Sequence, residues 1–280
     1  MAPAEHQVSA GRQAGDASTL TVATLNTRGS PLSGTHRAER SAAIGAEFEH
    51  SPVGVVGFQE VHTYCHLKQL RAHLPTFAHV AYVHTPVGPA GGLVTFSRTP
   101  FAETRFERFG RARGTSGMRW RTRVIAALNG SLITRVAGHD LHIVNTHPVA
   151  NHDGDWSEAN RFHALQSSQY AALAQLVREL SPRVVVIGDF NAPRESAVHA
   201  TFIAETGLRD VFGHRCPPTF HAEYLGPGQA PQCVDFILAA GDIVARHAEL
   251  ILDQEVAMPF GRGFVSDHLG LRADLLLHGY

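Results

Sequence analysis

Long hydrophobic runs, cysteine and lysine are all scarce in this chain of 280 residues. It contains no run of about 18 apolar residues, so we expect no membrane-spanning helix. The three cysteines, Cys65, Cys216 and Cys233, stand at unrelated spacings that form neither a zinc pattern nor a disulfide framework. The first twenty residues lack the apolar segment of a secretory signal. We therefore expect a cytoplasmic protein that begins with a disordered tail over residues 1–19.

Charge is nearly balanced overall but is unevenly distributed along the chain. The formal net charge is -1 at pH 7 and the pI is near 7.0, which excludes a general binder of polyanions. Lys68 is the only lysine, so arginine carries almost all the positive charge. The segment Arg98–Arg123 holds eight arginines and two glutamates, a local charge of +6. Planar guanidinium groups suit phosphate oxygens; the alternative interpretation is a solvated loop.

Hydrophobic residues make up 44% of the chain, enough to build a core. No linker or low-complexity segment interrupts residues 20–277, so we expect one domain over residues 20–280. Short apolar runs alternate with a few helical stretches. Strands are expected at residues 20–25, 53–58, 77–83, 93–96, 141–145, 184–187, 234–238, 249–252 and 269–276. Helices are expected at 35–48, 64–74, 157–180 and 196–205.

Two further local patterns complete the expected structure. Asn129-Gly130 favours a type I′ turn, which predicts a hairpin between strands at 124–128 and 131–136. Ser157 is positioned to cap the long helix that follows it. About ten strands and about four helices in mixed order predict an α/β protein with a large sheet component.

Acidic, amide and imidazole side chains follow several of the expected strands. They are Asn26, Glu60, His147, the pair Asp189 and Asn191 in Gly-Asp-Phe-Asn, and Asp267 and His268 in Ser-Asp-His. A single aspartate after a strand is usually a turn or cap residue, but five such sites in one chain favour a shared role. Hard oxygen donors without cysteine suit Mg²⁺ or Mn²⁺ better than zinc. With two histidines beside them, the set indicates phosphoester hydrolysis.

The order of these residues, with Asp235 added, resembles the endonuclease/exonuclease/phosphatase superfamily over about residues 20–277. That superfamily includes pancreatic-type deoxyribonuclease, abasic-site endonucleases, inositol polyphosphate 5-phosphatases and neutral sphingomyelinases. The text around the motifs is most similar to the sphingomyelinase branch, notably in His36–Arg40, Gly91–Pro100 and Asn145–His147. Two features depart from that branch: Pro148 replaces a common leucine, and the segment Asn151–Trp156 is particular to this chain.

The resemblance implies a fold and a role for each residue. The fold is a four-layer sandwich of two packed, mostly antiparallel β-sheets flanked by helices. Glu60 is implied as the main metal ligand, with Asn26 and Asp267 in the same shell. The catalytic roles are implied as follows: Asp189 orients or deprotonates the attacking water, Asn191 positions it, His147 and His268 contact the phosphate, and Asp235 fixes the tautomer of His268.

Together these features predict a metal-dependent phosphoester hydrolase in which water attacks the phosphorus of a small or lipid-like phosphodiester or phosphomonoester. Arg119, Arg121 or Arg123 could clamp the substrate phosphate, or all three could face solvent. The sequence contains no long apolar hairpin of the kind that secreted bacterial sphingomyelinases insert into membranes. A duplex-DNA substrate is not expected, because duplex binders usually have a pI above about 9. The alternatives are a Mg²⁺-dependent nuclease of the same superfamily, and a protein that uses the fold for binding or for another reaction.

Overall fold

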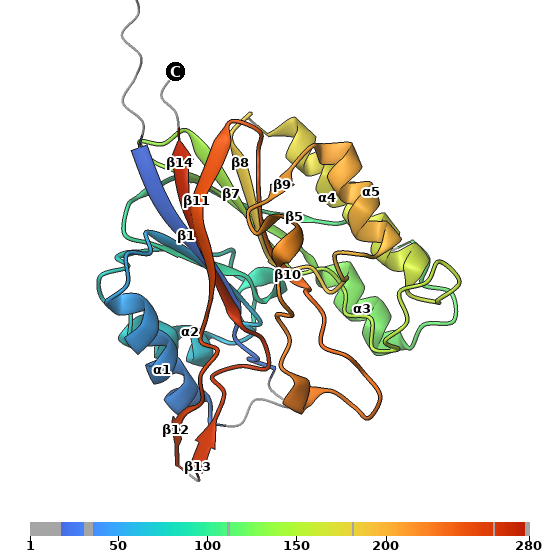
Figure 1. Cartoon of the computed structure of the whole chain (residues 1–280), viewed down its shortest axis with the longest axis horizontal. Helices are drawn as coiled ribbons and strands as arrows, with labels where there is room; N and C mark the ends of the chain where they lie inside the picture. Colours follow the sequence, from blue (N-terminus) through green and yellow to red (C-terminus); the bar gives the residue numbers. More distant parts are fainter. Residues whose placement is uncertain (1–17, 31–35, 111–112, 181, 260, 278–280) are drawn as a thin grey trace, which may run out of the picture.

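The computed structural model describes residues 18–30, 36–110, 113–180, 182–259 and 261–277 (Figure 1). The strands are β1 (Ser18–Asn26), β2 (Val55–Gln59), β3 (His79–Ala81), β4 (Val94–Ser97), β5 (Phe101–Arg108), β6 (Gly130–Val136), β7 (Leu141–Thr146), β8 (Val184–Asp189), β9 (Arg209–Asp210), β10 (Asp235–Ala239), β11 (Ile243–Ile251), β12 (Val256–Met258), β13 (Gly261–Gly263) and β14 (Gly270–Leu277). The helices are α1 (Arg37–Glu49), α2 (Tyr64–Ala72), α3 (Trp120–Leu128), α4 (His163–Glu179) and α5 (Ala197–Thr206), with short 3-10 turns η1 (Ala90–Gly92), η2 (Gly213–Arg215) and η3 (Ala222–Tyr224).

Two six-stranded sheets form the centre of the molecule. Their strand orders are β11-β14-β1-β2-β4-β3 and β5-β6-β7-β8-β10-β9. Each sheet contains one parallel pair in its middle, β1 with β2 and β7 with β8. The other pairings in both sheets are antiparallel. The predicted α/β fold with two mostly antiparallel sheets is therefore confirmed.

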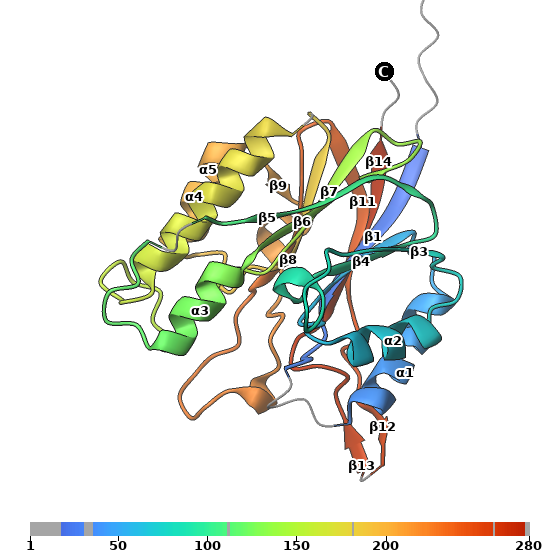
Figure 2. The same cartoon turned by 180° about the vertical axis from the view of Figure 1, so that it is seen from behind.

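Helices cover the outer faces of the two sheets. α1 and α2 lie beside the first sheet, and α3, α4 and α5 lie on the side of the second (Figures 1 and 2). The hydrophobic core has three large parts, one under α1 and α2, one between the sheets and one under α4 and α5. A small fourth cluster joins Ala126 of α3 to Val149 and Leu165. Residues 184–187 of β8 are all apolar because both faces of this strand are buried. Val184 and Val186 face the helices, while Val185 and Ile187 face the other sheet.

A buried polar bridge joins the two sheets close to the ends of their parallel pairs. The side-chain amide of Gln59, on β2, donates to Oδ1 of Asn145, on β7, over 2.7 Å. The Asn145 amide donates in turn to the backbone carbonyls of Phe58 and Val94, at 3.2 and 3.1 Å. Both side chains are fully buried. The bridge fixes the position of one sheet relative to the other just behind the strand ends that carry the polar residues.

The predicted hairpin at residues 124–136 is wrong. Residues 120–128 form α3, and β6 pairs with β5 and β7. A type I′ turn needs positive φ at both central residues, but Asn129 has φ -68° and Gly130 pairs with Arg108 at the start of β6. The polar strand β5 takes the edge position that the hairpin would have occupied. Its sequence, Phe-Ala-Glu-Thr-Arg-Phe-Glu-Arg, gave little sign of a strand.

One helix and one strand, α4 and β1, begin at other residues than the sequence predicted. Ser157 does not cap the long helix: α4 begins at His163, and Ser157 hydrogen-bonds to Asp155 instead. β1 begins at Ser18, and the rest of the expected tail, residues 1–17, lies outside the described residues. Within the described part of the chain, no helix has the length and apolar character needed to cross a bilayer.

Candidate active site

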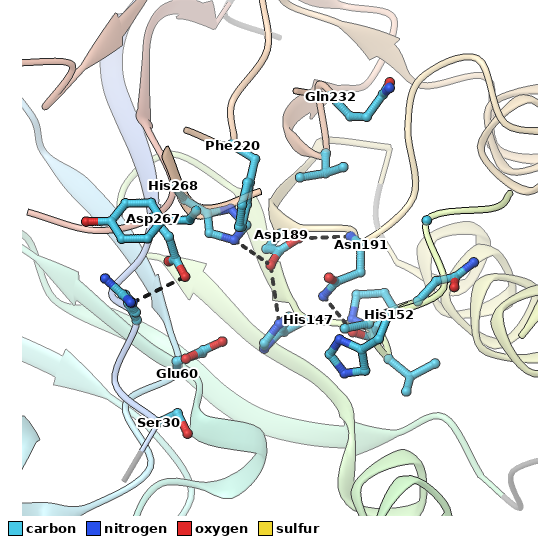
Figure 3. A pocket seen from close by; sticks show the side chains of 18 of the residues that line it. Ser30, Glu60, His147, His152, Asp189, Asn191, Phe220, Gln232, Asp267 and His268 are labelled. Atoms are coloured by element: carbon cyan, nitrogen blue, oxygen red, sulfur yellow. Dashed lines mark hydrogen bonds and ion pairs between the residues drawn. The ribbon is translucent and has the colours of Figure 1, made fainter. Parts of the chain in front are cut away.

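The polar residues that follow the strands meet at one end of the sandwich. Asn26 ends β1, Glu60 follows β2, His147 follows β7 and Asp189 ends β8. Because β1 and β2 run parallel, as do β7 and β8, the carboxyl ends of each pair lie at the same edge of their sheet. Apart from Asn26, these residues line a cavity of about 700 Å³, together with Asn191, Asp267 and His268 (Figure 3).

Asp189 is the centre of the hydrogen-bond network on the cavity floor. Its Oδ2 atom accepts from Asn26 Nδ2 at 2.9 Å and lies 3.4 Å from His147 Nε2 and 3.6 Å from His268 Nε2. Its Oδ1 atom accepts from the backbone N–H of Asn191 at 2.9 Å. The carboxylate is buried, so these donors replace water as its solvation shell.

Asp189 and His147 each favour the charged form of the other. Burial alone would raise the pKa of Asp189, but the charges of His268 and His147 and the hydrogen bonds from His147 and Asn26 hold that pKa well below its ordinary value. Burial alone would lower the pKa of His147, but the hydrogen bond to Asp189 and the charges of Asp189 and Glu60 raise it. Asp189 is therefore an anion at neutral pH, and its charge favours the protonated form of His147.

His268 lies between two carboxylates. Its Nδ1 atom is 2.8 Å from Asp235 Oδ2, and its Nε2 atom faces Asp189. Burial lowers the pKa of His268, but Asp235 and Asp189 raise it by more, so the pKa lies well above its ordinary value. Burial raises the pKa of Asp235 to about 6, although the His268 charge acts in the opposite direction. With a carboxylate at each ring nitrogen, the imidazole is held as a doubly protonated cation.

The segment before β10 holds the histidine ring in place. The Phe220 ring meets the His268 ring edge to face, with centroids 4.8 Å apart at 83°. The hydroxyl of Thr219 accepts the backbone N–H groups of Val234 and Asp235 at 3.0 and 3.1 Å. The backbone N–H of Leu269 donates to the carbonyl of Thr219 at 2.7 Å. The positions of Asp235 and His268 are thus fixed by one continuous set of contacts.

Glu60 and Asp267 supply the oxygens that fit a divalent cation. Both carboxylates line the cavity, and Figure 3 shows Asp267 above Glu60 on the same side of the view. Two carboxylates with room for water and a phosphate oxygen match the ligands of Mg²⁺ or Mn²⁺. The residues present therefore fit such an ion. Glu60 and Asp267 would hold it there.

The implied role of Asn26 as a direct ligand does not agree with its orientation. Its Nδ2 group donates to Asp189 and, at 3.3 Å, to Glu60 Oε1. Its Oδ1 atom accepts the backbone N–H of Arg28 at 3.0 Å, which fixes which end of the amide faces the carboxylates. An N–H group cannot bind a cation. In this arrangement Asn26 holds the two carboxylates by hydrogen bonds, and its implied role as a metal ligand stays a prediction.

Asp189, Asp235 and His268 form a second group whose possible ligand atoms lie within 4.8 Å of one another. A histidine binds a metal through an unprotonated nitrogen. The Nδ1 atom of His268 is hydrogen-bonded to Asp235, its Nε2 atom lies 3.6 Å from Asp189 Oδ2, and its raised pKa favours the protonated ring. We therefore interpret this group as a hydrogen-bonded relay rather than as a metal site.

Three cavity residues have an unusual backbone. Arg28, Glu60 and Asn191 have φ values of 48°, 61° and 51°, in the left-handed region that side chains other than glycine rarely adopt. Glu60 takes this conformation directly after β2, where the turn aims its carboxylate into the cavity (Figure 3). Backbone strain of this kind is concentrated at functional sites. In Asn191 the side-chain amide also donates to the carbonyl of Pro148, at 3.1 Å.

The arginines predicted to clamp a phosphate lie elsewhere. Arg119, Arg121 and Arg123 are exposed on and before α3, and none of them lines the cavity. Arg28 does line it, although it was not identified from the sequence. Its Nε atom is 3.4 Å from Asp267 Oδ2, and its guanidinium lies 4.2 Å from the centre of the Tyr224 ring. The one sequence feature that could have indicated a role for Arg28 in the cavity is its position two residues after Asn26.

The outer wall of the cavity comes largely from residues 219–234 and from the segment Asn151–Trp156. The wall is mixed in character, with Phe220, Tyr224, Leu225 and Trp156 beside the polar groups of His152, Gln229 and Gln232. Trp156 comes from the segment that the sequence analysis singled out as particular to this chain. At the base of the 219–234 segment, the Sγ atoms of Cys216 and Cys233 are 2.6 Å apart. The spacing of the cysteines in the sequence did not predict this contact.

Comparison with known proteins agrees with this geometry. The sequence profile of the Endonuclease/Exonuclease/phosphatase family matches residues 23–268. A search of curated proteins finds no match. Among solved structures, a beta toxin variant of Staphylococcus aureus with bound magnesium ions has a TM-score of 0.67 and 16% identity, covering 91% of this chain and 99% of that one.

Two further structures share the fold. Sphingomyelinase C from Streptomyces griseocarneus has a TM-score of 0.64 and 18% identity, covering 92% of this chain and 99% of its own. TDP2 from D. rerio, complexed with a single-strand DNA product, has a TM-score of 0.68 and 17% identity, with the same coverages of 92% and 99%. The family match covers most of the chain, including the strand-end residues described above. The chain therefore belongs to the endonuclease/exonuclease/phosphatase family and is a metal-dependent phosphoester hydrolase.

Proposed function

We propose that this hydrolase cleaves a small or lipid-like phosphoester by direct attack of water on phosphorus, without a covalent enzyme intermediate. The observation that carries the proposal is the buried Asp189 anion on the cavity floor, with His147 and His268 directed at the same oxygen. An anion with two cationic donors beside it can orient a water molecule and place N–H groups next to phosphoryl oxygens.

Each residue then has a distinct task. Asp189 accepts a hydrogen bond from the attacking water, orients it and takes up its proton as the new P–O bond forms. A protonated histidine gives a proton to the departing oxygen as the old P–O bond breaks. The imidazolium groups of His147 and His268 donate hydrogen bonds to the phosphoryl oxygens as negative charge develops there. Asp235 keeps His268 charged and oriented. Asn191 is held beside Asp189 by its backbone N–H, where its side chain can help to position the water.

The divalent cation at Glu60 and Asp267, when bound, neutralises charge on the phosphoryl and leaving oxygens. Arg28 lies beside Asp267 and adds a fixed positive charge to the same side of the cavity. The site therefore collects cationic groups around a single position, as phosphate binding requires.

The shape of the cavity favours a compact substrate over duplex DNA. A volume of about 700 Å³ with a mixed apolar and polar wall is typical of small-molecule sites. Duplex binding would need a wide basic surface, whereas the whole chain has a charge of -1. A nuclease acting on single strands is the second candidate, because TDP2 from D. rerio shares the fold and was solved with a single-strand DNA product.

The test is a substrate panel assayed with the purified protein and Mg²⁺. It contains sphingomyelin, phosphatidyl lipids, nucleotides, sugar phosphates, plasmid DNA and RNA, and it measures released phosphate and headgroup. We expect turnover of a small or lipid-like ester, loss of turnover on chelation, and recovery with Mg²⁺ or Mn²⁺. His268→Ala and Asp189→Asn should each lower kcat by roughly 10²–10⁴-fold.

Matched controls lie far from the cavity. His247→Ala on β11 and Asp140→Asn in the turn between β6 and β7 remove the same chemical groups from exposed positions, and should retain normal turnover. Activity that survives chelation would contradict the metal. Efficient, salt-sensitive cleavage of nucleic acid with no turnover of small esters would favour the nuclease instead.

A further inference from the structure

Helix α3 buries very little of its surface. Ala126 is its only buried residue. Four large apolar side chains on α3 are exposed: Trp120 at 68%, Val124 at 49%, Ile125 at 55% and Leu128 at 49%. Among the described residues, only Val87 and Val244 join them as exposed large hydrophobic side chains. Such a concentration on one short helix is unusual for a protein surface and marks a contact site.

The four apolar side chains form one stripe along the helix. At about 100° per residue, positions 120, 124, 128 and 125 fall within an arc of about 140°, and Arg121 lies inside this arc between Leu128 and Ile125. The opposite side of α3 packs on the protein through Ala126. Thr122, Ile125 and Asn129 line the cavity, so Ile125 belongs to both the stripe and the cavity wall. The stripe therefore begins at the mouth of the proposed active site and runs outward.

The surroundings of the stripe carry charge of one sign. Arg113, Arg119, Arg121 and Arg123 are all exposed. No aspartate or glutamate occurs between Glu107 and Asp140 in the sequence. Among the described residues, no ion pair involves any of these four arginines. Their charge is therefore available to an anionic partner.

We propose that α3 docks on the surface of a lipid bilayer that contains anionic phospholipid. The apolar stripe would enter the boundary between headgroups and acyl chains, and the arginines would contact the phosphates. Tryptophan, aliphatic side chains and arginine on one exposed helix are the composition of interfacial helices. A nucleic acid would use the arginines and could stack on Trp120, but it has no use for Val124, Ile125 and Leu128.

Docking in this way brings the cavity to its substrate. With α3 on the bilayer, the cavity mouth at Ile125 faces the headgroup layer, so a lipid can enter without leaving the membrane. The inference deepens the proposed function by naming a membrane phospholipid as the substrate class, and in that respect it rests on the proposed function. The docking itself is a binding event that can be measured without any turnover.

The experiment is vesicle flotation of the full chain with phosphatidylcholine vesicles and with mixed phosphatidylcholine–phosphatidylglycerol vesicles. We expect binding to the mixed vesicles that weakens as salt rises. The chain has two tryptophans, so a Trp156→Phe protein reports on Trp120 alone, and its emission should shift to the blue on binding.

Variants on the stripe and its arginines then assign the surface. Ile125→Ser with Leu128→Ser, and Arg121→Gln with Arg123→Gln, should each weaken vesicle binding by roughly tenfold or more. The matched control is Val244→Ser with Arg246→Gln, which removes an exposed apolar group and a charge from β11. It should bind vesicles as the parent does. Circular dichroism checks that each variant is folded.

Each outcome decides the proposal. Equal binding by the α3 variants and the parent, or no binding to mixed vesicles, overturns the docking. Loss of RNA or single-stranded DNA binding in the same variants, with vesicle binding unchanged, overturns it in favour of a nucleic acid. If docking fails while a soluble short-chain ester is still hydrolysed, the proposed function stands. If vesicles bind but no ester is hydrolysed, the docking stands and the proposed function fails.

Discussion

Gln59 and Asn145 share a 2.7 Å hydrogen bond between two different sheets, and each lies within two residues of a cavity side chain. Gln59 directly precedes Glu60, and Asn145 precedes His147 by two positions. The separation between the proposed metal ligand on one sheet and the proposed phosphate donor on the other depends on this bond. A polar contact in the middle of a hydrophobic sandwich thus has a geometric role at the site.

Replacing Asn145 by leucine should therefore affect stability and turnover together. The change removes the hydrogen bonds from the Asn145 amide to the carbonyls of Phe58 and Val94, and an unpaired buried group destabilises by about 1–3 kcal/mol. The Gln59 amide loses its bond to Asn145 but keeps those to Thr24 and Gly57. We expect the free energy of unfolding to fall by about 2–4 kcal/mol in urea titrations. The control is Thr134→Val, which removes a long 3.4 Å bond within one sheet. An Asn145→Leu protein as stable as the control would contradict this role.

The pH profile should report on Asp235, whose pKa is raised to about 6 by burial. As the pH falls through that value the carboxyl gains a proton and its ion pair with His268 is lost. We therefore expect kcat/KM to decline on the acid side with a midpoint near pH 6. Asp235→Asn cannot ionise, so this decline should disappear while overall activity is lower. Asp140→Asn, at an exposed position, should keep the parental profile, and an unchanged acid limb in Asp235→Asn would assign it to another group.

Arg28 is the arginine that should matter for phosphate binding. Its guanidinium lies between Asp267 and the Tyr224 ring and lines the cavity. A hydrogen bond to a charged group is worth about 1.5–3 kcal/mol, so Arg28→Gln should lower kcat/KM by roughly 10–100-fold on a soluble ester. Arg121→Gln with Arg123→Gln should leave the same assay unchanged. The reverse result would restore the phosphate clamp to the Arg119–Arg123 segment.

The cysteine pair predicts a count of free thiols. Cys216 and Cys233 have their sulfur atoms in contact, whereas Cys65 is exposed. Treatment with a low-molecular-weight disulfide should link Cys216 to Cys233 by thiol–disulfide exchange, so that neither of these two thiols remains free. After reversal of any mixed disulfide at Cys65, thiol titration should find one of the three thiols, and peptide mass mapping should locate the link. A Cys233→Ser protein is the control, and a titre of three in the parent would contradict the pairing.

Much of the site was predictable because its members share one simple placement. Asn26, Glu60, His147 and Asp189 each end or follow an apolar strand, and parallel pairing brings such ends to one edge. The layered arrangement of two sheets was expected from the resemblance to the superfamily, and the apolar residues on both faces of β8 agree with it. The direct metal contact of Asn26 stays a prediction, and the sequence could not show that its Oδ1 atom accepts the backbone N–H of Arg28.

Features that depend on tertiary contacts were missed. Residues 124–128 of α3 were expected as a strand because Asn129-Gly130 favours a hairpin turn, but β5 occupies the neighbouring edge of β6. Arg28 and the contact between Cys216 and Cys233 involve partners far along the chain, so no local pattern signals them. Sequence periodicity reports on burial within an element and not on which distant segment covers it.

The left-handed backbone at Glu60 lowers the stability of the fold, although the Glu60 side chain is needed for the proposed metal site. A side chain in that conformation costs about 1–2 kcal/mol, which glycine would not incur. A Glu60→Gly protein should therefore withstand more denaturant than the parent while losing metal-dependent turnover. Screens that reward thermal stability alone would select this substitution and inactivate the enzyme. The residue is thus informative for engineering: a stabilised variant of this chain should be sought everywhere except at the turn after β2.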